Sequence, residues 1–138
     1  MIFMREIIFR AKSKSNNEWM YMSLFCGFFT QNRLFAHIGT KSIESGFSEE
    51  IIPDTLCQYI GRNDKFGNPI FEGDIVRTQY GRLCSVVWFG GPNDIGWDLK
   101  PIEDKHPYPD AELWNSQYLE VVGNIFDDGE TINKKRIR

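Results

Sequence analysis

The chain has 138 residues, of which 41% are hydrophobic, 25% charged and 14% aromatic. This length lets one domain, 1–138, bury a core without a metal or a disulfide to hold it together. The formal net charge of −3 excludes a global attraction to nucleic acid or anionic membranes. The aromatic content favours strands, because aromatic side chains pack well on a half-buried sheet.

The N-terminal part of the sequence predicts short strands. Residues 11–17, AKSKSNN, are polar and typical of a turn, which would join two strands as a hairpin. Residues 39–53 are polar at first and are interpreted as a loop. Strands are predicted from the apolar runs at 4–10 and 18–24. The run at 25–29 is interpreted as a core strand or a buried crossing point, and 34–38 is a further short apolar run.

Residues 63–77, NDKFGNPIFEGDIVR, raise the question of whether they form a binding site or a pair of turns. They follow a short strand predicted at 56–60. Residues 63–68 combine Asn, Asp and Gly, which is turn chemistry. Gly73 lies between two acids in a second turn, where glycine accepts positive φ. The stretch therefore predicts two turns that lead into a strand at 74–79.

The C-terminal half predicts further strands from its Val, Ile and aromatic residues, at 82–89, 97–101 and 118–126. Glycine and proline mark the intervening loops, 90–96 and 102–110. Residues 110–116, DAELWNS, predict one short helix with Asp110 as its N-cap. Gly123 predicts a bend or bulge in the last strand. Residues 127–138 are expected to form a charged tail.

Many short strands separated by turns are typical of a small barrel or sandwich. A Gly-Asp-Ile-Val segment followed by a hairpin is common at the first long strand of SH3-like barrels. We therefore expect a mainly β (β-rich α+β) fold, with an SH3-like barrel core over about 57–126 and the N-terminal strands packed on it. A fold of this kind carries no information about function.

The three cysteines, Cys26, Cys57 and Cys84, are widely spaced and include no Cys-x-x-Cys pair. This spacing argues against a disulfide framework or a zinc knuckle, and we expect buried free thiols in a reducing cytoplasm. No run approaches the ~18 apolar residues that a membrane-spanning helix needs. The first ten residues, MIFMREIIFR, do not resemble a signal peptide, so a cytoplasmic location is expected.

Four blocks of the sequence resemble the YopX family of phage and prophage proteins. The longest, QYIGRNDKFGNPIFEGDIV at 58–76, matches the family's Gln-Tyr-x-Gly opening, its turn and its (Tyr/Phe)-Glu-Gly-Asp-Ile-Val ending. Two departures are Ala11-Lys12, where many relatives have Ala-Trp, and Asn63, where Lys is frequent. Both are expected at exposed turn positions. The other three blocks are REIIFRA at 5–11 with Met20-Tyr21, VVW at 86–88 with 96–101, and EVVGNIF at 120–126.

The resemblance implies a strand-rich phage or prophage protein in a bacterial host cell, self-associating and without catalytic residues that can be carried over. It marks the motif turns as structural: Gly61, Asp64, Gly67, Glu72, Gly73, Asp74, Gly123 and Asn124.

The acids of the motif turns invite a metal-binding interpretation. Asp64, Glu72 and Asp74 lie close together in the sequence. An EF-hand loop needs acidic ligands at alternate positions, but Lys65 and Gly67, or Phe66 and Asn68, would fall there. We expect these carboxylates to hydrogen-bond the backbone of their own turns. No metal and no cofactor is predicted.

Catalytic motifs are missing from the sequence. His37 lies in an apolar run and His106 in a proline-rich loop, and neither has a nucleophile beside it. No phosphate-binding glycine motif is present. A hydrolase or nuclease that uses Asp64, Asp74 or His106 remains the least favoured alternative.

Six aromatic residues fall within one third of the chain: Trp88, Phe89, Trp97, Tyr108, Trp114 and Tyr118. We expect them mainly to fill the core. The alternative is an exposed patch, centred on Trp88, Trp97 and Trp114, that binds a protein partner or stacks on bases.

The basic C-terminus, with Lys134, Lys135 and Arg136, is interpreted as a solvated tail, because three acids precede it. The alternative is a nucleic-acid-binding arm. The sequence thus favours a protein that acts by binding rather than by catalysis, with itself or a phage or host protein as partner. A nucleic-acid-binding module is the second possibility.

Overall fold

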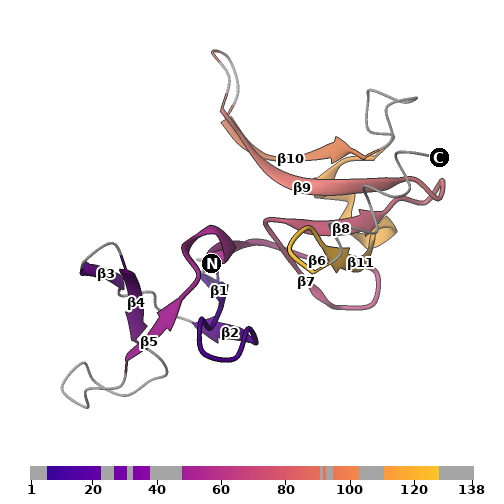
Figure 1. The fold of residues 1–138 in the computed structure, drawn as a ribbon. Helices are drawn as coiled ribbons and strands as arrows, with labels where there is room; N and C mark the ends of the chain where they lie inside the picture. Colours follow the sequence, from indigo (N-terminus) through magenta and orange to yellow (C-terminus); the bar gives the residue numbers. More distant parts are fainter. Residues whose placement is uncertain are drawn as a thin grey trace. The chain divides into compact units, whose positions relative to one another are not determined.

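The computed structural model describes residues 6–22, 27–30, 33–37, 48–90, 92, 95–102 and 111–127. These residues form strands and short 3-10 helices and contain no α-helix, so the predicted mainly β class is confirmed (Figure 1). The elements are β1 Phe9–Lys12, β2 Trp19–Met22, β3 Gly27–Thr30, β4 Arg33–His37, β5 Ser48–Ile51, η2 Pro53–Thr55, β6 Cys57–Asn63, β7 Pro69–Phe71, β8 Asp74–Arg77, β9 Leu83–Gly90, β10 Ile95–Pro101, η3 Leu113–Tyr118 and β11 Glu120–Asn124.

The chain divides into two compact units, Met1–Tyr59 and Ile60–Arg138. Strand pairing gives three sheets, with the orders β2-β1-β6-β7, β3-β4-β5 and β10-β9-β8-β11. Strand β6 crosses the boundary between the units, and its first residues pair with β1 through Phe9↔Gln58 and Arg10↔Cys57. That the whole chain forms one domain stays a prediction.

The first unit contains the predicted N-terminal hairpin, because β1 and β2 pair antiparallel. The boundaries differ from the prediction. Ala11 and Lys12 were expected in an exposed turn, but β1 continues through both and both are buried. Ala11 packs with Met22, Leu34 and Ile51 in the core of this unit. A small side chain at this position fits under the apolar residues of three neighbouring strands, which overrides the polar composition of the segment.

Alternation along β1 puts its basic residues on the opposite face from Ala11. The Arg10 guanidinium lies 4.6 Å from the centre of the Trp19 ring, and Lys12 Nζ lies 5.4 Å from it. Both cationic groups lie over the aromatic ring, which helps to explain how two cationic residues of one strand become buried.

Strand β5 is a correction, because residues 39–53 were predicted as a loop. Its residues pair with β4 through Leu34↔Ile51 and Phe35↔Glu50. Ile51 is buried, whereas the Glu50 carboxylate accepts a hydrogen bond of 2.7 Å from Arg33 Nε. Only one strongly apolar residue anchors the strand, so the sequence pattern was too weak to reveal it.

The second unit is built on the sheet β10-β9-β8-β11. Eight of its buried residues form one apolar cluster, and Cys84 is a buried free thiol within it. Cys57 is a buried free thiol of the first unit. Cys26 lies outside the described residues. The cluster consists of Ile60, Ile70, Val76, Cys84, Val86, Leu99, Leu113 and Leu119.

The predicted SH3-like barrel is not confirmed. In the described residues β10 and β11 are the two edges of an open sheet and do not pair with each other. The predicted helix at 110–116 is wrong in type and position: residues 113–118 form a 3-10 helix that begins after Glu112, and no side chain caps it. Asp110 lies outside the described residues. The last strand does contain the predicted bulge, between Val121 and Gly123.

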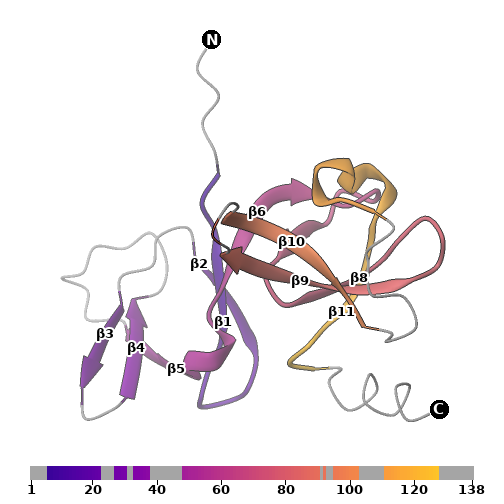
Figure 2. The same ribbon diagram turned by 90° about the horizontal axis from the view of Figure 1, so that it is seen from above.

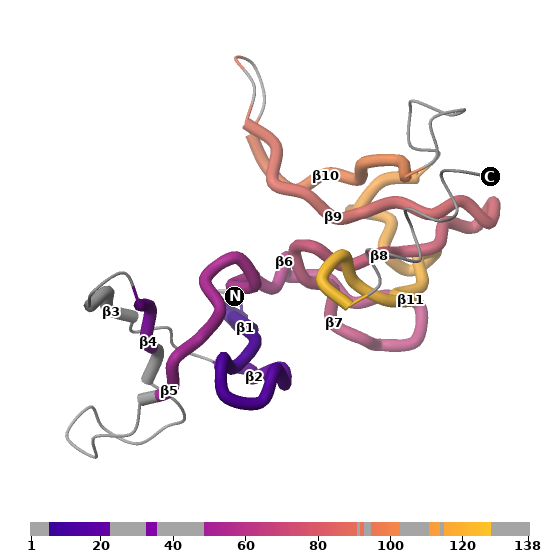
Figure 3. Tube along the Cα trace, viewed as in Figure 1, coloured from indigo at the N-terminus to yellow at the C-terminus, as the bar shows by residue number. Residues whose placement is uncertain are grey.

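Strands β9 and β10 form a long hairpin whose outer end projects beyond the rest of its unit (Figures 1 and 3). Seen from above, the two strands lie side by side along their length (Figure 2). The last fully buried pair of the hairpin is Val86↔Leu99. We call the described residues beyond that pair, 87–90 and 95–98, the β9–β10 arm. Because Ile95 and Gly96 belong to β10, the loop predicted at 90–96 is too long.

Candidate functional site

The turn at 63–68 is organised around the Asp64 carboxylate. Its Oδ1 accepts hydrogen bonds from the backbone N–H groups of Phe66, at 2.9 Å, and Asn68, at 2.8 Å. Its Oδ2 accepts the backbone N–H of Val121 on β11 at 2.9 Å. Asp64 is only 5% exposed. One side chain therefore closes its own turn and joins that turn to the last strand.

The pKa of Asp64 follows from these contacts. Burial opposes ionisation and is the largest single influence, but the N–H groups of Val121, Asn68 and Phe66 together outweigh it. The pKa of Asp64 is therefore lower than its ordinary value, and the residue is ionised at neutral pH. Its lone pairs point at the protein backbone rather than at a substrate.

In the second turn, at 72–74, the polar groups of Asp74 and Gly73 also bond to the protein backbone. Asp74 is 1% exposed, and its Oδ2 accepts the backbone N–H of Phe71 at 2.8 Å. Gly73 has a φ of 83°, donates its N–H to Val86 O and accepts the N–H of Ile125, both at 2.8 Å. Burial raises the pKa of Glu72. Glycine is favoured at 73 because φ is positive and a Cβ there would lie 2.9 Å from Phe126 Cε2.

The remaining motif turns are likewise local structure. Gly61 and Gly67 have φ values of 90° and 83°. The Asn124 side chain follows the bulge at Gly123, and its Oδ1 accepts the backbone N–H groups of Phe126 and Asp127 at 3.0 and 2.9 Å.

The predicted absence of a metal site and of catalytic motifs concerns the acids and histidines. Within the described residues, no group of three or more His, Cys, Asp or Glu side chains is placed to hold a metal ion. His106 lies outside these residues, and for His37 only the backbone on β4 is described. In the same part of the chain no helix is long and apolar enough to span a membrane. The acids that the sequence drew attention to, Asp64 and Asp74, do not converge on an open cavity.

The β9–β10 arm has the opposite character. Trp88 faces Trp97 across the two strands, with ring centres 4.7 Å apart at 74°. Trp97 is partly buried against the core, but Trp88 is 53% exposed and Ile95 is 75% exposed. The apolar face that begins in the core at Val86 thus continues along the arm into solvent.

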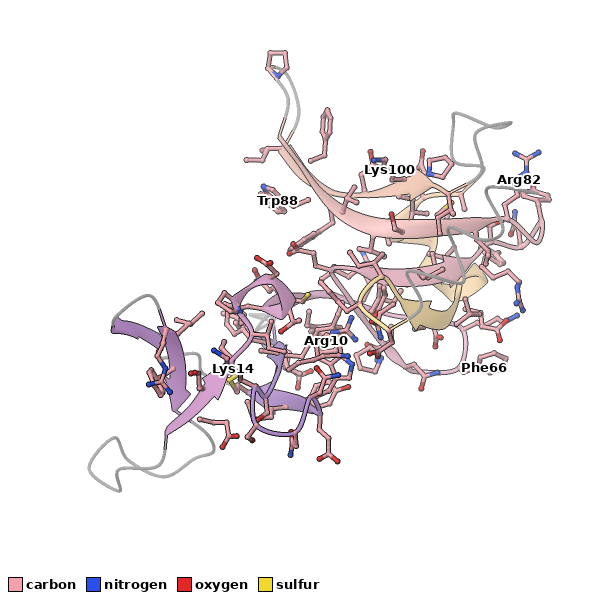
Figure 4. The ribbon with its side chains drawn as sticks, in the orientation of Figure 1. Arg10, Lys14, Phe66, Arg82, Trp88 and Lys100 are labelled. Atoms are coloured by element: carbon pink, nitrogen blue, oxygen red, sulfur yellow. The ribbon has the colours of Figure 1, made fainter. Side chains whose placement is uncertain are left out.

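The arm also carries residues on its other face. Phe89 is 49% exposed, and Lys100 and Trp88 extend from opposite faces of the hairpin (Figure 4). An open depression of about 280 Å³ lies at the outer end of the arm, lined by Phe89, Ile95, Gly96, Trp97 and Asp98.

The prediction that the aromatic residues mainly fill the core is wrong for Trp88, Phe89 and Tyr118, of which Tyr118 is 52% exposed. The physical reason for the first two is that β9 is longer than the core it covers. The structure brings Trp88 and Trp97 into contact, and the binding patch that the alternative interpretation placed on them stays a prediction. Trp114 belongs to η3, but its side chain is not described, and Tyr108, Lys134, Lys135 and Arg136 lie outside the described residues.

The sequence prediction missed Ile95 as a strand residue, because 90–96 was interpreted as a loop. It also did not single out Asp98 and Lys100, which lie in the strand predicted at 97–101. The signal was present in the alternation of Ile95, Trp97 and Leu99 with Gly96 and Asp98.

Comparison with known proteins places the chain in a family. The crystal structure of protein EF1440 from Enterococcus faecalis is similar at 17% sequence identity and a TM-score of 0.49, covering 91% of this chain and 97% of that one. No curated protein matches. The family model described as YopX protein matches residues 8–133, and that range includes the motif turns and the β9–β10 arm. The chain therefore belongs to the YopX family.

Proposed function

We propose that this protein is a non-enzymatic accessory protein of a phage or prophage that acts by binding proteins, either other proteins or further copies of itself, in the cytoplasm of the bacterial host. The observation that carries the proposal is the β9–β10 arm, which exposes Trp88, Phe89 and Ile95 together at the end of a two-stranded ribbon. Aromatic residues gathered on a projecting hairpin are typical anchors of protein interfaces. The motif-turn acids support the proposal indirectly, since they are used within the fold.

Binding of single-stranded nucleic acid is the second candidate, because an exposed ring such as Trp88 can stack on a base. The charges of the described arm do not favour it. Asp98 lies on the arm and Lys100 just beyond it, so their charges cancel. Nucleic-acid grooves are strongly basic by comparison.

The test is affinity capture from phage-infected cells with the tagged full chain, with and without nuclease. We compare the wild type with the double variant Trp88→Ser/Phe89→Ser and with the control Tyr80→Ser, which removes a 66% exposed aromatic residue outside the arm. The proposal expects a defined protein that survives nuclease and is lost only in the double variant. Loss of all bound material after nuclease treatment would favour the nucleic-acid candidate. Turnover in a hydrolase or nuclease screen that disappears with a His or Asp substitution would overturn the proposal.

A further inference from the structure

We propose that the free edge of β10 pairs with the same edge of a second copy of the chain, antiparallel about a two-fold axis at Leu99. This inference rests on the proposed function, which it deepens by naming one partner and the edge that binds it.

The first observation is that β10 has an unpaired edge. In the described residues its only strand partner is β9, since it ends the sheet order β10-β9-β8-β11. The N–H of Ile102 is donated to the carbonyl of Leu83, its opposite residue in the β9–β10 register. Backbone groups alternate in direction along a strand, so those of Gly96, Asp98 and Lys100 also point toward β9. Those of Ile95, Trp97 and Leu99 point outward, to the free edge.

The second observation is that the edge is only partly protected. Proteins commonly block free edges with charges and proline. Here Pro101 lacks an outward N–H, and Asp98 Oδ1 accepts the outward N–H of Leu99 at 2.8 Å. Among the described residues, nothing comparable occupies the N–H of Trp97 or the outward carbonyl groups.

The third observation is a charge pattern that complements itself. Asp98 and Lys100 are exposed, lie two residues apart on one face and flank Leu99. With the axis at Leu99, Asp98 of each copy lies opposite Lys100 of the other, which gives two ion pairs. An axis one residue earlier would place Asp98 opposite Asp98, and like charges directly opposite each other destabilise a sheet. An axis at Trp97 would place Asp98 opposite glycine.

The same register uses the available backbone groups. Each Leu99 donates to Leu99 of the second copy, and each Trp97 donates to the carbonyl of Pro101 of the second copy. The missing N–H of Pro101 is therefore tolerated. The Asp98 carboxylate releases the Leu99 N–H and turns to Lys100 of the second copy. Trp97 and Pro101 meet on the other face, so the pairing also covers apolar surface of the arm. An interface of this kind is closed and isologous, as most dimer interfaces are.

The experiment is analytical ultracentrifugation of the full chain over a concentration series, with Asp98→Lys, Lys100→Asp and the double exchange Asp98→Lys/Lys100→Asp. We expect a reversible dimer for the wild type. Each single reversal creates two like-charge pairs across the axis and should weaken dimerisation by about tenfold or more, whereas the double exchange should restore it. Circular dichroism checks that all four proteins fold.

A wild type that stays monomeric at all concentrations would overturn the proposal, and so would single reversals without effect or a double exchange that fails to restore the dimer. Because ultracentrifugation uses the purified chain without other proteins, these outcomes are independent of whether another protein is captured through Trp88 and Phe89. Failure of the edge pairing is thereby distinguished from failure of the proposed function.

Discussion

The turn at 63–68 and the β9–β10 arm lie in the same unit and differ in how they use their polar and apolar groups. The turn is rich in charged and amide residues, yet Asp64 directs its oxygens at three backbone N–H groups. The arm is mostly apolar, yet it leaves Trp88 half exposed, and among the described strands only β9 pairs with β10. The comparison teaches that chemically conspicuous residues can be used within the fold, while an ordinary strand leaves large apolar side chains exposed.

The largest effect is expected from removing the centre of the turn. Asp64→Ala leaves the N–H groups of Phe66, Asn68 and Val121 without their acceptor. Each buried group left unpaired costs about 1–3 kcal/mol, so we expect a loss of about 3–5 kcal/mol in the free energy of unfolding, measured by urea denaturation. Asp64→Asn keeps one acceptor oxygen and should lose less. A loss below about 1 kcal/mol for Asp64→Ala would contradict the structural role of the Asp64 carboxylate in this turn.

The next effect separates two glycines with the same φ of 83°, Gly73 and Gly67. A Cβ added to Gly73 would lie 2.9 Å from Phe126 Cε2, whereas one added to Gly67 would meet nothing within 4 Å. Gly67→Ala should therefore cost only the left-handed strain, about 1–2 kcal/mol. Gly73→Ala should cost more by about 1–3 kcal/mol, because the packing must also shift. If the two variants lose the same free energy of unfolding in thermal or urea denaturation, the Phe126 side chain moves away from the added Cβ without cost.

The pH dependence of stability sharpens the contrast between two acids of the motif turns. The folded state lowers the pKa of Asp64, so its contribution is present at neutral pH and is lost as the pH falls through the folded pKa. Burial raises the pKa of Glu72, so protonation of Glu72 favours the folded state and has the opposite sign.

Urea unfolding at pH 7 and pH 3 measures both contributions. Asp64→Asn should lose less stability than the wild type between these pH values. Glu72→Gln should lose more than the wild type, because it lacks the gain from protonation. A parallel pH profile for the wild type and Asp64→Asn would contradict the ionised, hydrogen-bonded state of Asp64.

The smallest stability effect is expected on the arm. Val86 is buried, and Val86→Ala should cost about 1–3 kcal/mol. Trp88, two residues further along β9, is 53% exposed, so Trp88→Ala should cost only the edge-to-face contact with Trp97, about 0.5–1.5 kcal/mol. Trp88→Ala is also expected to abolish capture of a protein partner, which Val86→Ala should not. Equal destabilisation by the two substitutions would show that Trp88 is packed as tightly as a core residue, and would contradict its exposure on the arm.

Much of the second unit could be predicted from local patterns. Asn, Asp and Gly at 63–68 indicated a turn, and Gly123 indicated the bulge. The partner of Asp64 could not be predicted, because Val121 lies 57 residues away. Strand β5 was missed because one buried Ile51 and an ion-paired Glu50 leave almost no apolar pattern.

Exposure on the arm depends on how far the elements packed against β9 extend, which the sequence pattern does not show. Val86 and Trp88 share one face of β9, and the same alternation assigns both to the core. Only the length of the opposing elements decides that Val86 is covered and Trp88 is not. The sequence also does not predict that β10 is an edge strand, because the order of strands in a sheet follows from long-range pairing.

The most direct test of the proposal that the free edge of β10 pairs with a second copy is amide hydrogen exchange at low and high protein concentration. We predict that the amides of Phe66, Asn68 and Val121 exchange slowly at both, since Asp64 accepts all three. The amide of Trp97 should exchange rapidly in dilute solution and become protected at high concentration. A Trp97 amide whose exchange does not depend on concentration would contradict the account.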